Sequence, residues 1–135
     1  MIVIDASALS KYILREKNWI EVENYLLKGL YSIDYIVKEV ANSLWKHTVV
    51  FNRFSEKEYR VAYMILKKIV EEEVIMLEDQ MGYMDEAVEI AFKNKITVYD
   101  SLYIAQALKY GELLTSDKKQ VEVAEKLGIK VYYIK

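Results

Sequence analysis

The fold class follows from one segment, ITVYDSLYIAQALKYGELLTSDKKQVEVAEKLGIKVYYI, which spans residues 96–134. Short apolar runs alternate in it with amphipathic ones, and two of the amphipathic runs end at glycine, a common terminator of helices. The segment predicts strands at 96–98, 113–115 and 130–134 and helices at 100–110 and 118–127. This β/α alternation is typical of an α/β fold with a mostly parallel central sheet and helices on both faces.

The residues before this segment fit the same architecture. A buried strand is expected at 1–4, a short extended piece at 31–34 and another strand at 74–77. Ser55 followed by Glu58 is a capping box, which predicts the start of a helix. Together with apolar spacings of three and four residues, it predicts five helices, at about 8–13, 19–28, 35–51, 55–69 and 84–92.

Composition limits the classes of protein and of chemistry. The 135 residues are close to the size of one domain, so a single domain over 1–135 is expected. No cysteine is present and His47 is the only histidine, which leaves no thiolate zinc site and little material for Ser/His/Asp or Cys/His catalysis. No apolar run approaches the roughly 20 residues of a membrane span, and a cytoplasmic location is expected.

Charge gives no global sign of nucleic-acid binding. The formal net charge is −2 and the pI is near 5.5, whereas a strongly basic surface is typical of tight nucleic-acid binders. A local basic patch remains open, with candidates at Lys11, Arg15, Lys38, Lys46, Arg53, Lys93, Lys95, Lys118 and Lys119, although lysines are also the ordinary residues of a solvated face.

Three of the six aspartates follow expected strands by one or two residues: Asp5, Asp100 and Asp117. Carboxyl ends of parallel strands lie at one edge of a sheet, so these side chains are expected to meet in one cleft. Each also precedes an expected helix, where aspartate is a favoured N-cap. Three such residues after separate strands favour a functional cluster, and clustered carboxylates suit Mg²⁺ or Mn²⁺.

A fourth acidic candidate lies on the expected helix at 35–51. Tyr35, Glu39, Asn42 and Lys46 share one stripe of that helix beside its apolar stripe, so the carboxylate of Glu39 lies at a boundary where it can face a cleft. Spacing alone leaves a surface glutamate as the more ordinary interpretation. His47, among Trp45, Val49 and Val50, is interpreted as a packing or surface residue.

Four segments together resemble the PIN-domain nucleases, and especially the VapC-like toxins of toxin–antitoxin pairs. They are MIVIDASAL at the N-terminus, EVANSL at 39–44, YDSLYIAQA at 99–107 and LLTSD at 113–117. Each is weak alone, but they occur in the expected order and cover nearly the whole chain. The resemblance implies a PIN-like three-layer sandwich.

The resemblance also implies a site and a reaction. Asp5, Glu39, Asp100 and Asp117 would bind Mg²⁺ or Mn²⁺, and an activated water would cut RNA. Small polar residues beside these acids would orient a ligand or water, or equally cap the local backbone; they are Ser7, Asn42, Thr115 and Ser116. The family often has proline before the helix that carries the glutamate, whereas this chain has Ile33-Asp34-Tyr35, which leaves the start of that helix open.

The same resemblance implies partners: a homodimer and a small antitoxin that masks the site. The helical pair 35–73, rich in Tyr, Phe and Trp, is a candidate surface for either partner, although aromatic residues at helical spacing are more often core.

Two other functions compete with the nuclease hypothesis. A phosphoaspartyl phosphatase or receiver domain also carries aspartates at strand ends, but the phosphatases need a second aspartate where Ser7 stands, and receivers pair acidic residues directly after the first strand. A catalytically silent binding module on the same fold is the second alternative, and the four intact acids count against it.

Overall fold

The computed structural model describes residues 1–135 and is built on five parallel strands. In chain order these are β1 (Ile2–Ile4), β2 (Leu30–Ile33), β3 (Ile75–Glu78), β4 (Glu112–Thr115) and β5 (Lys130–Tyr133). Their order in the sheet is β3-β2-β1-β4-β5, and every neighbouring pair is parallel. All carboxyl ends therefore lie at one edge, and β1, which is followed directly by Asp5, is the central strand.

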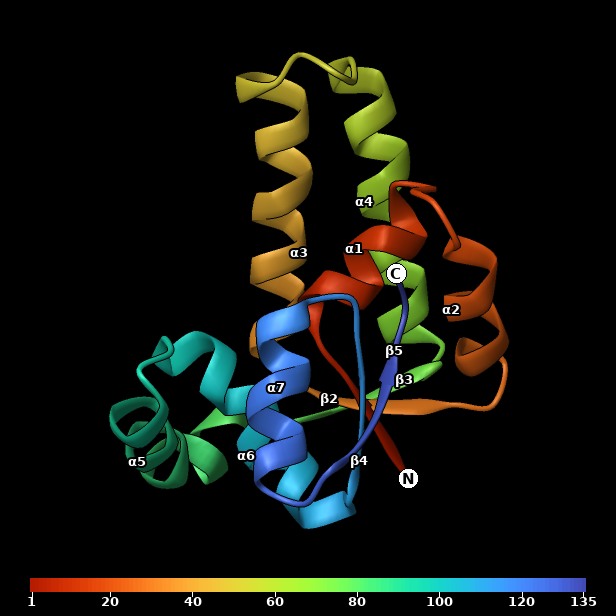
Figure 1. Cartoon of the computed structure of the whole chain (residues 1–135). Helices are drawn as coiled ribbons and strands as arrows, with labels where there is room; N and C mark the ends of the chain where they lie inside the picture. Colours follow the sequence, from red (N-terminus) through yellow and green to blue (C-terminus); the bar gives the residue numbers. More distant parts are fainter.

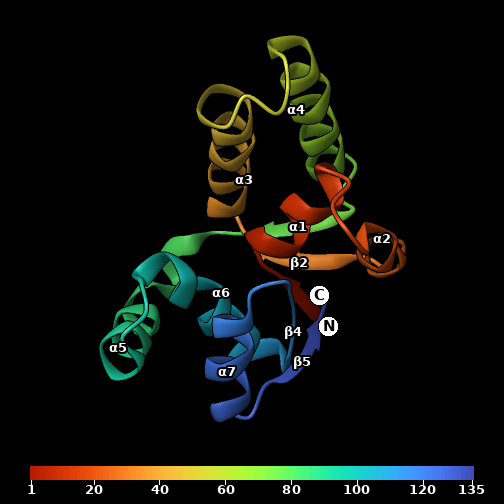
Figure 2. The ribbon, with the colours of Figure 1, turned by 45° about the horizontal axis from the view of Figure 1, so that its top comes forward.

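Helices cover both faces of the sheet, which confirms the three-layer expectation (Figure 1). Helices α1 to α4 lie on one side, and α5 to α7 lie on the other (Figure 2). Their bounds are α1 Ala6–Ile13, α2 Trp19–Leu26, α3 Tyr35–Trp45, α4 Glu56–Glu71, α5 Met84–Asn94, α6 Val98–Tyr110 and α7 Lys118–Lys126. A 3-10 turn, Gln80–Tyr83, precedes α5. None of these helices is long and apolar enough to cross a membrane.

The central strand and α6 form the middle of the core. Val3 and Ile4 of β1 have no exposed surface, and residues 101–107 of α6 are all buried. A helix buried nearly all round is held in place by both the sheet and its neighbours, here α5 and α7. Asp5, directly after β1, and Asp100, in the first turn of α6, are therefore attached to buried elements of the core.

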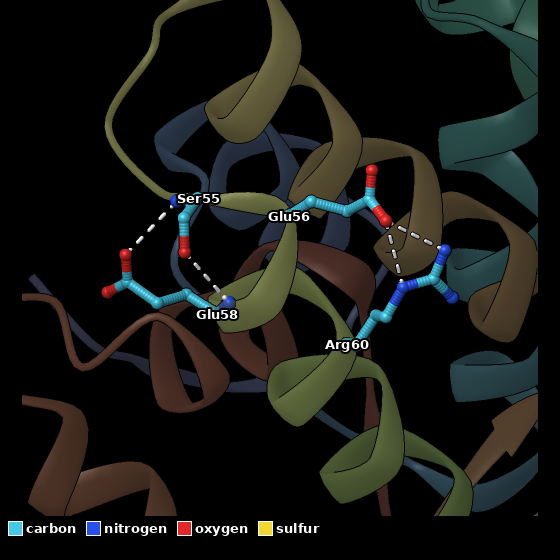
Figure 3. A network of polar contacts seen from close by, with 4 residues as sticks. All are labelled: Ser55, Glu56, Glu58 and Arg60. Carbon is cyan, nitrogen blue, oxygen red and sulfur yellow. Dashed lines mark hydrogen bonds and ion pairs between the residues drawn. The ribbon is translucent and has the colours of Figure 1, made fainter.

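The predicted capping box at the start of α4 is present (Figure 3). The hydroxyl of Ser55 accepts from the backbone N–H of Glu58, and the Glu58 carboxylate accepts from the N–H of Ser55. One turn on, Arg60 pairs with Glu56. These contacts fix the first turns of α4, and α3 and α4 project together from the sheet (Figure 1).

One predicted strand is wrong. The β-branched run Ile96-Thr97-Val98 forms no strand, because Thr97 is the N-cap of α6 and Val98 is already helical. The Thr97 hydroxyl accepts from the N–H of Asp100, which fixes the first turn of the helix. Asp100 therefore follows no strand and is no N-cap, and the premise that three aspartates follow three strands holds only for Asp5 and Asp117.

The helix bearing Glu39 begins without proline. Helix α3 starts at Tyr35, and the side chain of Asp34 makes no cap to it. Instead, Asp34 accepts from the N–H of Gln80, which lies just after β3. At its other end α3 continues as a turn of π-helix, Lys46–Val50, so helical backbone spans nearly the predicted range 35–51.

Candidate active site

A pocket of about 460 Å³ contains all four predicted acidic residues. Asp5 follows β1, Glu39 lies on α3, Asp100 on the first turn of α6, and Asp117 follows β4. Carboxylates from four separate parts of the fold thus line one pocket. The prediction that Asp100 follows a strand was wrong, because Asp100 lies on α6 with no strand directly before it.

Asp5 is held more tightly than the other three. It is only 3% exposed, it is the N-cap of α1, and its Oδ1 accepts from the Ala8 N–H at 3.1 Å. The same oxygen accepts from the hydroxyl of Ser7 at 2.6 Å. Its second oxygen, Oδ2, accepts from the hydroxyl of Thr115 at 2.5 Å. Both carboxylate oxygens are therefore oriented by donors of this chain.

Burial opposes the negative charge that these donors favour. Removal from water raises the pKa of Asp5 to about 6, hydrogen bonds from Ser7, Thr115 and the Ala8 backbone lower it, and the neighbouring Asp117 raises it. The central carboxylate thus carries a charge that costs free energy in the absence of a nearby cation.

Glu39 is held by a residue that motif reasoning did not single out. The hydroxyl of Tyr103, on α6, donates to Oε1 of Glu39 at 2.6 Å. Burial raises the pKa of Glu39, Asp100 raises it further, and the Tyr103 hydrogen bond lowers it. The motif YDSLYIAQA contained Tyr103, but its contact with Glu39 joins residues 64 positions apart, and nothing in the local sequence indicates it.

Asp100 and Asp117 are the other two predicted acids that line the pocket. Burial raises the pKa of Asp100, and the charge of Asp117 raises it further, whereas Thr97 and the cation of Lys119 lower it. Asp117 is the N-cap of α7, where its Oδ1 accepts from the N–H of Lys119 at 2.9 Å. Capping and membership of the acidic cluster are therefore compatible in the same residue.

The predicted supporting residues divide into two groups. Ser7, Thr115 and Ser116 form a hydrogen-bonded group around Asp5, in which the Ser7 Oγ accepts from the Ser116 N–H and the Thr115 Oγ1 accepts from the Asp117 N–H. Asn42 is exposed and does not line the pocket, and a role for it stays a prediction.

Three basic residues also line the pocket: Lys11, His47 and Lys135. The ammonium group of Lys11 is buried and donates to the backbone carbonyls of Lys17 and Lys135, not to a carboxylate. His47, interpreted from the sequence as a packing or surface residue, lines the pocket from the π-helical turn, where its Nδ1 is 3.3 Å from Nη1 of Arg53. The helical pattern gave no signal of this position, because a π-turn shifts the phase of the side chains that follow it.

The donor set suits a hard divalent cation. All four acids offer oxygen and none takes part in an ion pair, and burial and neighbouring carboxylates both disfavour the charges of Asp5, Glu39 and Asp100. No three of the acidic or histidine side chains are arranged to ligate a single ion. The residues therefore fit Mg²⁺ or Mn²⁺ in their chemistry, and all four line one pocket. A bound ion would have to draw their side chains together.

Comparisons with known proteins agree with this fold. Residues 2–126 match the model of the PIN domain family. The chain is 30% identical over 124 residues to Ribonuclease VapC3 of Pyrobaculum aerophilum, over 90% of this chain and 92% of that protein. The fold is similar to the crystal structure of PAE2754 from the same organism, with a TM-score of 0.67 and 24% identity over 97% of this chain and 92% of the other. The chain therefore belongs to the PIN domain family.

Proposed function

We propose that this protein is an endoribonuclease that hydrolyses RNA phosphodiester bonds with the help of Mg²⁺ or Mn²⁺. The observation that carries the proposal is the pocket in which Asp5, Glu39, Asp100 and Asp117 converge without a pairing cation. Membership of the PIN family and the likeness to a relative named as a ribonuclease support it. The same two findings favour a nuclease over a phosphoaspartyl enzyme or a silent binding module.

The four carboxylates would hold the ion, and the protein's own donors would hold the carboxylates. Ser7 and Thr115 orient Asp5, and Tyr103 orients Glu39, so two of the four carboxylates would be oriented before substrate arrives. Such an ion supplies positive charge to a phosphate oxygen and lowers the pKa of water, so no side-chain nucleophile is required. This agrees with a chain that has no cysteine and a single histidine.

The experiment is cleavage of single-stranded RNA by purified protein with Mg²⁺, with Mn²⁺ and with EDTA. We expect cleavage with either metal and none in EDTA. The same assay compares Asp100→Asn with Asp79→Asn. Asp79→Asn is the control, because Asp79 is an exposed capping aspartate outside the pocket. Full cleavage by metal-stripped protein would refute the metal mechanism, and products with 2′,3′-cyclic phosphates would point to attack by the ribose hydroxyl.

The proposal includes the biological setting that the resemblance to VapC-like toxins implies. The chain would be the cytoplasmic toxin of a toxin–antitoxin pair, act on RNA, form a homodimer and be silenced by a cognate antitoxin. Co-expression with the protein encoded by the neighbouring reading frame tests this setting. We expect a larger complex with suppressed cleavage; a monomer at micromolar concentration whose activity ignores that neighbour would contradict it.

A further inference from the structure

Two tyrosines stack beside the acidic pocket. The rings of Tyr35, at the start of α3, and Tyr99, in the first turn of α6, have centroids 5.1 Å apart and planes inclined by only 13°. Tyr99 is 57% exposed, although its ring packs on a neighbour. Since a stacked neighbour covers one face of a ring, this exposure leaves a large part of the Tyr99 ring open to solvent.

Each stacked tyrosine lies close in the chain to one of the acids that line the pocket. Tyr99 directly precedes Asp100, and Tyr35 lies one helical turn before Glu39 on the same face of α3. One turn further along both helices, Tyr103 donates to Glu39. Helices α3 and α6 thus meet in two successive contacts, an aromatic one outside the pocket and a polar one within it.

The electrostatics agree with this placement. Burial raises the pKa of the Tyr35 hydroxyl, and the charges of Glu39 and Asp100 raise it further, so this hydroxyl lies within the field of both acids. The stacked pair therefore lies next to Glu39 and Asp100, outside the pocket that these two acids line.

We infer that Tyr35 and Tyr99 form a stacking platform for a nucleobase of the RNA substrate next to the cleaved bond. The inference rests on the proposed function. Single-stranded nucleic acids are commonly held by bases stacked on exposed aromatic rings, and this interaction tolerates any base because each has a π-face. A neutral platform also suits a chain of net charge −2, which lacks the overall positive charge that would attract the phosphates.

The structure contains a matched pair for comparison. Tyr59 and Tyr63 on α4 are also stacked, with planes inclined by 9°, and Tyr63 is 38% exposed. Like Tyr35 and Tyr99, neither residue lines the acidic pocket, but α4 carries none of the four acids. Tyr63→Ala therefore removes an exposed, stacked tyrosine without touching the proposed substrate path.

The first test is the KM for cleavage of a short single-stranded RNA in Mn²⁺. Tyr99→Ala is expected to raise KM about tenfold, as the loss of one stacked base would. Tyr99→Phe, which keeps the ring, should restore most of that loss, and Tyr63→Ala should leave KM at the wild-type value. A KM for Tyr99→Ala equal to that of Tyr63→Ala would overturn the platform and leave the pair as a packing device or a protein contact.

The second test separates base stacking from phosphate contacts. A nucleoside 5′-monophosphate should inhibit cleavage more strongly than ribose 5-phosphate, and Tyr99→Ala should abolish this difference. If this difference in inhibition persisted in Tyr99→Ala while the wild-type protein still cleaved RNA, the stacking platform would be refuted and the nuclease proposal would stand. Absence of cleavage by the wild-type protein in every metal would instead refute the proposed function, and the platform with it.

Discussion

The hydroxyl of Tyr103 donates a 2.6 Å hydrogen bond to Glu39 and so ties the middle of α6 to α3. Tyr103→Phe deletes this donor and leaves a half-buried carboxylate without its partner. We expect a loss of stability of about 1–2 kcal/mol, because hydrogen bonds to charged groups are stronger than average. We also expect weaker Mn²⁺ binding and slower cleavage, because Glu39 would lose its fixed orientation.

A second tyrosine separates these two effects. Tyr132 donates a hydrogen bond of the same length, 2.6 Å, to Glu112, and neither residue lines the pocket. Tyr132→Phe should therefore lower the melting temperature without changing the half-saturating Mn²⁺ concentration for cleavage. Equal metal dependence of the two variants would assign Tyr103 a purely structural role.

Thr115 makes the corresponding contribution at Asp5. Its hydroxyl donates to Asp5 and accepts from the N–H of Asp117, so Thr115→Val breaks both contacts while keeping nearly the same shape. We expect a cost of about 1–3 kcal/mol and a loss of cleavage larger than the loss of folded protein explains. The same substitution at Thr48, whose hydroxyl only donates to the Leu44 carbonyl, should leave cleavage intact. Measurement of kcat on samples matched for folded fraction distinguishes the two.

Sequence patterns predicted those parts of the site that depend on local structure. Asp5 and Asp117 each follow a strand and cap a helix, and both features have short-range signals in strand propensity and N-cap preference. The fold class could be predicted for the same reason, because each strand and helix of the β/α alternation has its own pattern within about ten residues.

The rest depends on contacts between distant parts of the chain. The β-branched run Ile96-Thr97-Val98 has strand propensity, yet the Thr97 cap and the buried position of α6 make its end helical, because tertiary packing outweighs a weak local preference. Glu39 could be raised above a surface glutamate only by the family resemblance, since its hydrogen-bond partner Tyr103 lies on another element.

Glu78 gives the fold a pH dependence that is separate from the pocket. Burial alone would raise its pKa, but hydrogen bonds from Tyr83, Gln106 and Tyr110, with the cation of Lys109 nearby, lower it to about 2. Because the pKa is lower in the folded protein than the ordinary 4.5, this carboxylate stabilises the fold above pH 4.5 and loses that effect as pH falls toward about 2.

Glu78→Gln should therefore flatten the decline of stability between pH 4.5 and about 2. We expect a contribution of about 2 kcal/mol, less than the full pKa shift implies, because the side chain is 28% exposed and solvent screens its charge. Denaturant unfolding across this pH range is the measurement. Tyr110→Phe, which removes one donor, should give an intermediate slope, and parallel slopes for all three proteins would contradict the assignment.

Asp100→Asn distinguishes an acidic cluster from acids that only stabilise helix ends. Asp100 suits this test better than Asp5, because Asn at position 5 would turn an amide N–H toward the donors Ser7 and Thr115. If Asp100 only favours the N-terminus of α6, losing its charge should lower stability by about 0.3–1 kcal/mol, with or without metal. If burial and the charge of Asp117 disfavour its own charge, as its raised pKa indicates, the substitution should raise the melting temperature in EDTA.

We expect added metal to reverse the order of the melting temperatures of the wild type and Asp100→Asn. A ligand that binds only the folded state stabilises it according to its affinity, so millimolar Mn²⁺ should raise the melting temperature of the wild type more than that of Asp100→Asn. The control Asp79→Asn removes an exposed aspartate outside the pocket and should show the wild-type response to metal. RNA cleavage should fall only in Asp100→Asn. Unchanged cleavage in that variant, together with a metal-independent drop in its melting temperature, would make Asp100 a helix-end residue and refute its place in a metal site.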